Sequence, residues 1–117
     1  MLQFIEYPKC STCRKAKAEL IQLGVDFEAV DIVKETPSQE QLLQWMTDSD
    51  LEIKSFFNTS GIKYRELGLK DKVTNFSAEE AAALLATDGM LIKRPLLVQD
   101  GRIVQVGYRT EYKELNL

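Results

Sequence analysis

The stretch Leu2-Gln3-Phe4-Ile5-Glu6-Tyr7-Pro8-Lys9-Cys10-Ser11-Thr12-Cys13 decides how the start of this chain folds. Its first half is a short apolar run that ends before Pro8, which is typical of a buried strand. From Ser11 onward, apolar residues recur at spacings of three and four, which predicts a helix that stops at Gly24. The apolar positions of this helix are Ala16, Leu20 and Leu23. The two cysteines therefore lie where a predicted strand gives way to a predicted helix.

Cys10 and Cys13 are the only cysteines of the chain. If the helix begins at Cys10, the unpaired N–H groups of its first turn and the positive end of its dipole favour the thiolate. Lys9 and Arg14 add positive charge nearby. Cys13 follows about one helical turn later, close enough to displace a partner bound to Cys10 through a mixed disulfide. This spacing predicts a redox-active pair in which Cys10 attacks and Cys13 resolves.

Two alternatives to a redox role of the cysteine pair stay open. A structural zinc ion needs about four cysteine or histidine ligands, and the chain has no third cysteine and no histidine. We therefore expect no metal within one chain, although a zinc ion shared between two chains would satisfy the same rule. The second alternative is a pair of buried thiols without chemistry. We expect no other cofactor.

Size and charge exclude several classes of protein. The 117 residues fall within the single-domain range, and the 44% hydrophobic and 28% charged residues are ordinary for a folded protein. No apolar stretch approaches the ~20 residues of a membrane span, and the start of the chain lacks a secretion signal, so we expect a cytoplasmic protein. The net charge of −3 gives no electrostatic reason for direct nucleic-acid binding.

Outward from the first helix, Phe27 to Val33 is rich in β-branched residues and predicts a second strand, parallel to the first. Residues of about 37–90 are expected to be all helical. Two capping-box patterns, one at Ser38 and one at Ser77, open helices there. The expected helical segments are the one holding Leu42 to Met46, Leu51 to Phe57 closed by Gly61, Tyr64 to Leu69, and Ala81 to Ala86 closed by Gly89.

The last part of the chain predicts a hairpin. Leu96 to Val98 and Ile103 to Val106 are short apolar runs joined by the turn Asp100-Gly101, and Thr110 to Leu115 is expected to be a terminal helix. The order βαβ, helices, ββ, α predicts an α/β, thioredoxin-like fold with a four-stranded mixed sheet flanked by helices. We expect one domain over residues 1–117, with the helical insertion at about 37–90.

Four segments together resemble the arsenate reductase (ArsC)/Spx family of thioredoxin-fold proteins, and the resemblance covers essentially the whole chain. They are Tyr7-Pro8-Lys9-Cys10-Ser11-Thr12-Cys13-Arg14-Lys15-Ala16, Phe56-Phe57-Asn58-Thr59-Ser60-Gly61, Tyr64-Arg65-Glu66-Leu67-Gly68-Leu69 and Leu91-Ile92-Lys93-Arg94-Pro95-Leu96. The resemblance implies that the Arg94-Pro95 bond is cis beside the cysteine loop and that Arg94 faces the reactive sulfur. It implies catalytic roles for Cys10, Cys13 and Arg94 and substrate contacts for Arg14, Asn58 and Pro95.

Three positions depart from the arsenate-reducing branch of that family. Those enzymes carry a histidine where this chain has Glu6, an arginine where it has Asn58, and typically one cysteine in the loop, whereas this chain adds Cys13. Arsenate is a multiply charged anion that needs several cationic donors at once. The departures argue against arsenate as the substrate.

Two functions from different classes follow from the resemblance. The first is a small thiol–disulfide oxidoreductase or reductase that draws electrons from thioredoxin, glutaredoxin or glutathione. The second is a redox-sensing regulator similar to Spx, which binds the C-terminal domain of the RNA polymerase α subunit. A thioredoxin-fold binding protein without redox chemistry is a third alternative.

Overall fold

The computed structural model describes all residues, 1–117. The chain forms two compact units. The first, which we call the sheet unit, joins Met1–Asp31 to Arg94–Leu117, and the second, the helical unit, is Ile32–Lys93. The predicted helical insertion of about 37–90 falls inside the helical unit.

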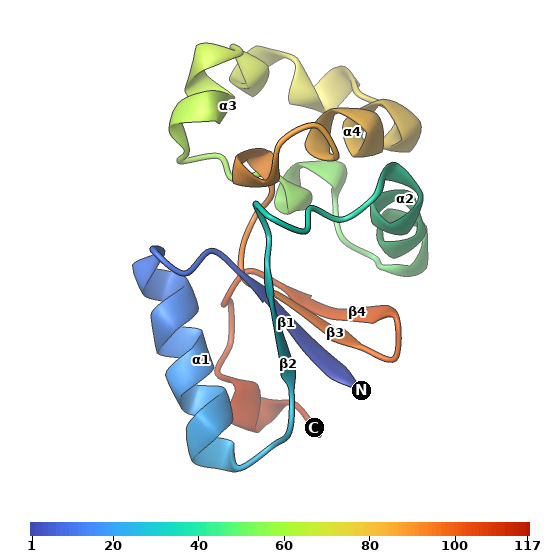
Figure 1. The fold of residues 1–117 in the computed structure, drawn as a ribbon. Helices are drawn as coiled ribbons and strands as arrows, with labels where there is room; N and C mark the ends of the chain where they lie inside the picture. Colours follow the sequence, from blue (N-terminus) through green and yellow to red (C-terminus); the bar gives the residue numbers. More distant parts are fainter. The chain divides into compact units, whose positions relative to one another are not determined.

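The sheet unit is built on four strands in the order β2-β1-β3-β4 (Figure 1). The central strand β1 (Leu2–Glu6) runs parallel to β2 (Glu28–Asp31) and antiparallel to β3 (Leu96–Gln99), which pairs antiparallel with β4 (Arg102–Val106). The predicted mixed sheet and α/β class are confirmed. β2 is shorter than the predicted Phe27–Val33, because only four of those residues pair with β1.

The hairpin between β3 and β4 turns at Asp100-Gly101, as predicted. Asp100 and Gly101 have φ angles of 50° and 81°, so both central residues adopt the left-handed conformation that a two-residue hairpin turn of the primed type requires. The strand register shifts between Leu97 and Val98, which places a bulge in this hairpin.

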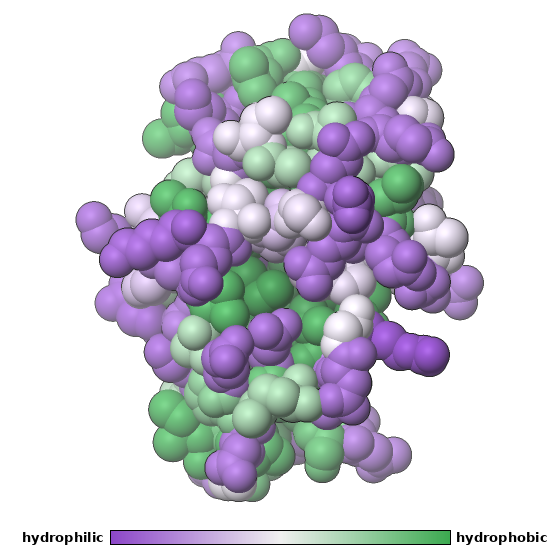
Figure 2. Space-filling view, turned by 45° about the vertical axis from the view of Figure 1, so that its right-hand side comes forward, coloured by the Kyte–Doolittle hydropathy of each residue, from purple (hydrophilic) through white to green (hydrophobic).

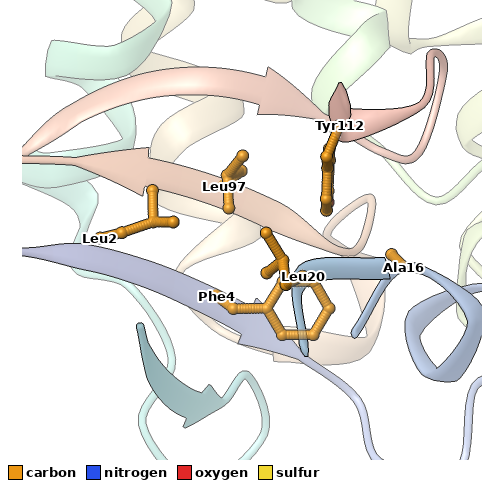
Figure 3. Packing of buried hydrophobic residues seen from close by; sticks show 6 residues of the cluster. All are labelled: Leu2, Phe4, Ala16, Leu20, Leu97 and Tyr112. Atoms are coloured by element: carbon orange, nitrogen blue, oxygen red, sulfur yellow. The ribbon is translucent and has the colours of Figure 1, made fainter. Parts of the chain in front are cut away.

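One face of the sheet carries the main core of this unit. The helix α1 (Ser11–Leu23) and the C-terminal segment lie over that face (Figure 1). Figure 3 shows six buried side chains of the core meeting between these layers: Leu2, Phe4, Ala16, Leu20, Leu97 and Tyr112. Leu23, which the pattern places on the buried face of α1, is 42% exposed because it lies in the last turn, beyond the edge of the core.

The predicted terminal helix Thr110–Leu115 is wrong in type and length. The segment forms only a 3₁₀ turn, η5 (Tyr112–Glu114). The backbone N–H groups of Tyr112 and Lys113 donate to the Glu19 carboxylate of α1 rather than to carbonyls of a helix of their own. An amphipathic pattern over six residues does not nucleate an isolated helix.

The helical unit contains α2 (Gln39–Asp48), α3 (Ile62–Glu66) and α4 (Ala78–Leu85), with α2 packed against α4. Short 3₁₀ turns lie between these helices and after the last one: η1 (Ile53–Phe56), η2 (Leu69–Asp71), η3 (Val73–Asn75) and η4 (Gly89–Leu91). The capping box at Ser77 is confirmed by both of its hydrogen bonds. At Ser38 the hydroxyl caps the backbone N–H of Gln41.

Two glycines of this unit do not close helices as predicted. Gly61 precedes α3 as its N-cap residue, and Gly89 begins η4. A β-carbon at Gly89 would collide with the Ile32 carbonyl oxygen, so glycine is needed there for close backbone approach. That neighbour is distant in sequence, which is why a helix-end pattern misplaces this residue.

On the face shown in Figure 2, hydrophilic side chains form most of the surface, and hydrophobic residues appear as separate patches between them. None of the helices combines the length and the apolar character that crossing a bilayer would require.

Candidate dithiol site

The loop that ends β1 delivers Cys10 to the start of α1. The backbone N–H of Cys10 donates to the Tyr7 carbonyl at 2.9 Å and closes a turn, and the Cys10 carbonyl accepts from the Arg14 N–H at 3.1 Å. With φ −86° and ψ 124°, Cys10 is the N-cap residue of α1. This confirms the predicted position of Cys10 at the mouth of the helix.

The two sulfurs differ in exposure. Both cysteines are free thiols; Cys10 is half-buried, whereas Cys13 is 0% exposed. Cys13 shares the buried face of α1 with Ala16 and Leu20, each of which follows the one before it by about one helical turn. Only Cys10 can therefore meet a large substrate without a conformational change.

The surroundings of Cys10 favour its thiolate. Partial burial alone would raise the pKa, but hydrogen bonds from the backbone and the thiol of Cys13, and a hydrogen bond and the positive charge of Arg94, together bring the pKa of Cys10 below its ordinary value. The helix N-terminus acts in the same direction. Cys10 is thus the sulfur of the pair that forms a thiolate more readily.

Cys13 has the opposite tendency. Burial raises the pKa of Cys13 to about 12, and the hydrogen bond and negative charge shared with Cys10 add to that rise. A hydrogen bond with the Tyr7 backbone and the charge of Arg94 act against it without prevailing. In the reduced protein Cys13 is a neutral thiol that donates to its neighbour.

Arg94, two residues before β3, reaches the cysteine loop. Its guanidinium carbon lies 5.1 Å from the centre of the Tyr7 ring, a cation–π contact that fixes the direction of the side chain. The Arg94–Pro95 bond is cis, as the resemblance implies. Pro95 is buried, and its carbonyl accepts the Gly107 N–H at 2.8 Å. The structure therefore brings Cys10, Cys13 and Arg94 together.

Glu6 occupies the position four residues before Cys10 that a histidine holds in the arsenate-reducing branch. It is a buried carboxylate, 5% exposed, and Lys17 Nζ lies 2.9 Å from its Oε2. This pair ties the end of β1 to the second turn of α1. The sequence does not predict the pair, because neither residue carries a local signal of the contact.

The side chains of Arg14 and Asn58 donate to backbone carbonyls. Arg14 is exposed, and its guanidinium donates to the Lys9 carbonyl at 3.4 Å. Asn58 belongs to the helical unit, where its backbone N–H donates to the Leu91 carbonyl and its side-chain amide to the Met90 carbonyl. Substrate binding by these two residues stays a prediction.

A cluster around Glu19 of α1 is not foreseen by any sequence motif. The carboxylate of Glu19 accepts hydrogen bonds from the Tyr108 hydroxyl and the Tyr112 backbone N–H, both at 2.6 Å, and from the Lys113 N–H at 3.1 Å. These contacts hold the C-terminal segment against the helix that carries the cysteines. The partners lie about 90 residues apart in the chain, so no pattern within a short window reveals them.

Metal-ligating side chains do not gather in groups of three or more. The candidate site brings together two thiols, one guanidinium and the start of a helix. That set can perform thiol–disulfide exchange, in which the electrons pass through sulfur alone.

Comparisons with known proteins agree with this architecture. The ArsC family model matches residues 5–115. The uncharacterized protein YusI of Bacillus subtilis is 50% identical over 115 residues, which cover 98% of this chain and 97% of YusI. The global transcriptional regulator Spx of Lactiplantibacillus plantarum is 27% identical over 104 residues, covering 89% of this chain and 76% of Spx.

Among solved structures, a Streptococcus mutans protein described as a possible arsenate reductase is 61% identical. It superposes with a TM-score of 0.97 over 100% of this chain and 98% of its own. The segment that the family model matches includes the cysteine loop, all of the helical unit and most of the thioredoxin-like sheet. The chain belongs to the ArsC family.

Proposed function

We propose that this protein is a thiol–disulfide oxidoreductase in which Cys10 is the nucleophile and Cys13 the resolving thiol. The observation that supports the proposal most directly is the opposite behaviour of two sulfurs one helical turn apart. The half-buried sulfur has a lowered pKa, and the buried one has a pKa raised to about 12. Burial alone would raise the pKa of an inert thiol such as Cys13, so the lowered pKa of Cys10 is the part of this difference that an inert pair would not explain.

The reaction proceeds in two exchanges. The Cys10 thiolate attacks one sulfur of a substrate disulfide, the substrate S–S bond breaks, and half of the substrate leaves as a thiolate. Cys13 then loses its proton and attacks the Cys10 sulfur, so that a Cys10–Cys13 disulfide forms and the second substrate thiolate leaves. Thioredoxin, glutaredoxin or glutathione returns two electrons to the pair and restores both thiols.

Arg94 serves the first exchange. Its guanidinium stabilises the Cys10 thiolate, and because a guanidinium carries several N–H donors it can also bind an oxyanion or carboxylate of the substrate. Arg14, Asn58 and Pro95 complete the proposed substrate contacts. Because Glu6 is paired with Lys17 and Asn58 carries no charge, we propose a disulfide or another thiol-reactive substrate in preference to arsenate. The reducing cytoplasm would supply the donor thiols.

The experiment is a trapping assay with a disulfide substrate. Wild-type protein should release the substrate thiol and form an internal disulfide, whereas Cys13→Ser should accumulate a mixed disulfide on Cys10 that mass spectrometry detects. Thr12→Ser, a change in the same loop that keeps both thiols, is the control and should behave as wild type. Release by Cys13→Ser at the wild-type rate would reject the resolving role.

The substrate is tested in parallel under the three donors. Disulfide reduction and arsenate reduction are each measured with thioredoxin, glutaredoxin and glutathione. We expect turnover of the disulfide and little of arsenate. Arsenate turnover of the same efficiency would contradict the substrate assignment while leaving the dithiol mechanism standing.

The similarity to Spx supports a second candidate, a redox-switched regulator that contacts the C-terminal domain of the RNA polymerase α subunit. In that case the disulfide is a signal rather than an intermediate. Pull-down of the α-subunit domain by oxidised and by reduced protein, with Cys10→Ser as a control that cannot switch, tests this candidate. Binding that changes with oxidation, without turnover under any donor, would favour it over the enzyme.

A further inference from the structure

Tyr112 presents a buried hydroxyl that has no hydrogen-bond partner. The residue is 0% exposed, and its hydroxyl oxygen is among the few buried polar side-chain atoms without one. Burying an unsatisfied O–H costs stability, so each such group calls for an explanation. The proposed function does not use this group.

Tyr112 packs on the buried face of α1, the same face that carries Cys13, the proposed resolving thiol. Tyr112 extends from the C-terminal segment toward α1, beside Ala16 and Leu20 in the core cluster (Figure 3). Cys13 lies on the same buried face, one turn before Ala16. The pKa of Tyr112 lies well above its ordinary value because of burial, and the negative charges of Tyr108, Cys13 and Glu19 contribute in that order.

The backbone around Tyr112 is held in place. Glu19 accepts the Tyr112 N–H at 2.6 Å, and the Tyr108 ring packs edge-on against the Tyr112 ring with their centres 4.9 Å apart. The ring therefore has little freedom to turn its hydroxyl toward solvent. A donor held over the helix face that also carries Cys13 is a preorganised arrangement.

The resolving exchange, in which Cys13 attacks the Cys10 sulfur, creates a need for such a donor. In the reduced protein the Cys13 thiol hydrogen-bonds to the Cys10 sulfur. Once Cys10 is bound to substrate through a mixed disulfide, its sulfur is no longer a thiolate. Cys13 must then lose its own proton in a buried setting before it can attack. Cys10 and Arg94 are the charged groups that shift the pKa of Cys13, and Cys13 in turn contributes to the raised pKa of Tyr112.

We propose that the Tyr112 hydroxyl donates a hydrogen bond to the Cys13 sulfur as its thiolate forms, and thereby accelerates the resolving exchange. This inference rests on the proposed function, because it assumes that Cys13 attacks Cys10. The proton of Cys13 goes to solvent or to the departing thiolate, and Tyr112 keeps its own. The S–S bond to substrate breaks while the Cys10–Cys13 bond forms, so no further oxidant or reductant is required.

The test uses an aryl disulfide that releases a coloured thiolate at each exchange. The first release reports attack by Cys10, and the second reports displacement by Cys13. Tyr112→Phe removes only the hydroxyl oxygen and keeps the ring. We expect the first release to be unchanged and the second to slow about tenfold near neutral pH, the size of one hydrogen bond to a charged group.

The pH profile distinguishes a donor from a structural role. The gap between Tyr112→Phe and wild type should close at a pH high enough to ionise Cys13 without help, measured after a rapid pH jump. A packing defect would instead slow the second release at every pH. Placing fluorotyrosine at position 112 is a second variant; its more acidic hydroxyl is a stronger donor and should accelerate the second release.

Tyr64→Phe is the matched control. Tyr64 is also a buried tyrosine, 4% exposed, whose hydroxyl has no partner, but it lies in the helical unit. Its variant should leave both releases unchanged. A second release in Tyr112→Phe equal to that of wild type would overturn the donor role. Absence of any second release in wild type would instead reject the proposed function.

Discussion

At the scale of single residues, the site depends on where each sulfur sits in one helix. Cys10 is the N-cap residue, where backbone N–H groups point outward, and Cys13 belongs to the buried face three residues later. The same chemical group thus acquires a lowered pKa in one place and a raised pKa in the other. The proposed roles, with Cys10 as the nucleophile and Cys13 as the resolving thiol, follow from these positions and need no third cysteine.

Arg94 is expected to set the reactivity of Cys10. Arg94→Met keeps an unbranched side chain of similar length but removes the hydrogen bond and the positive charge that lower the pKa of Cys10. The pKa of Cys10 should therefore rise. Alkylation of Cys10 near pH 6 should slow, and the rates of variant and wild type should converge at alkaline pH, where both are thiolates.

Arg102→Gln provides the control for this change. Arg102 is an exposed residue of β4, and its loss alters the net charge by the same amount. Its alkylation profile should coincide with that of wild type. An unshifted profile in Arg94→Met would remove Arg94 from the site.

The residues that the sequence can predict carry either a local pattern or a family motif. Cys10 and Cys13 follow from the strand–loop–helix pattern, and Arg94 from a resemblance to a family. Glu19 and Tyr112 carry no such signal. Their roles arise from their mutual contact, 93 residues apart in sequence, which only the folded sheet creates.

At the scale of elements, local patterns predict the boundaries that short-range hydrogen bonds determine. The strand β1, the start of α1 and the capping box of α4 agree with the structure because short-range bonds determine them. The last segment, Thr110 to Leu115, is not a helix because its backbone N–H groups bond to Glu19 instead. Tertiary partners override helical propensity in so short a segment.

Glu19 should hold the C-terminal segment in a pH-dependent way. Desolvation would raise the pKa of Glu19, but hydrogen bonds from Tyr108, Tyr112 and Lys113 outweigh it and lower the pKa. A carboxyl group with a lowered folded-state pKa contributes stability above its unfolded pKa of about 4.5, and that contribution is lost as the pH falls through the folded value. Acid should therefore loosen this segment.

Glu19→Gln should loosen the same segment at neutral pH, because an amide accepts these hydrogen bonds less strongly than a carboxylate. Amide hydrogen exchange at Tyr112 and Lys113 should accelerate relative to wild type. Glu114→Gln, an exposed change in the same segment, should leave exchange at these amides unaltered. Equal protection in Glu19→Gln and wild type would show that packing alone holds the segment.

At the scale of the whole molecule, one thiol and several tyrosine hydroxyls have raised pKa values, and these should make the folded protein sensitive to alkali. Burial raises the pKa of Cys13 to about 12 from an ordinary 9.0, and burial with the Glu19 carboxylate raises the pKa of Tyr108 to about 12 from 10.0. Burial also raises the pKa of Tyr112 and of Tyr64, so both the sheet unit and the helical unit contain such groups.

The sign of the effect follows from proton linkage. Between pH 9 and pH 12 the unfolded chain releases these protons while the folded chain keeps them, so the unfolded state binds fewer protons and the free energy of unfolding falls as the pH rises. Cys10 acts the other way, because its folded pKa is lowered, but its contribution is complete once the pH exceeds the unfolded value of 9.0. Above that pH only the destabilising groups remain.

We therefore expect the urea midpoint of the reduced protein to decline steadily from about pH 9 upward. Tyr112→Phe should flatten this decline, because it removes one hydroxyl that ionises only in the unfolded chain. Tyr64→Phe should flatten it as well, and more weakly if the helical unit unfolds separately from the sheet unit, so the two variants also report which unit loses stability first. A midpoint that holds constant to pH 11 in wild type would mean that these hydroxyls and the Cys13 thiol reach water in the folded protein, and it would remove the burial on which their shifted pKa values depend.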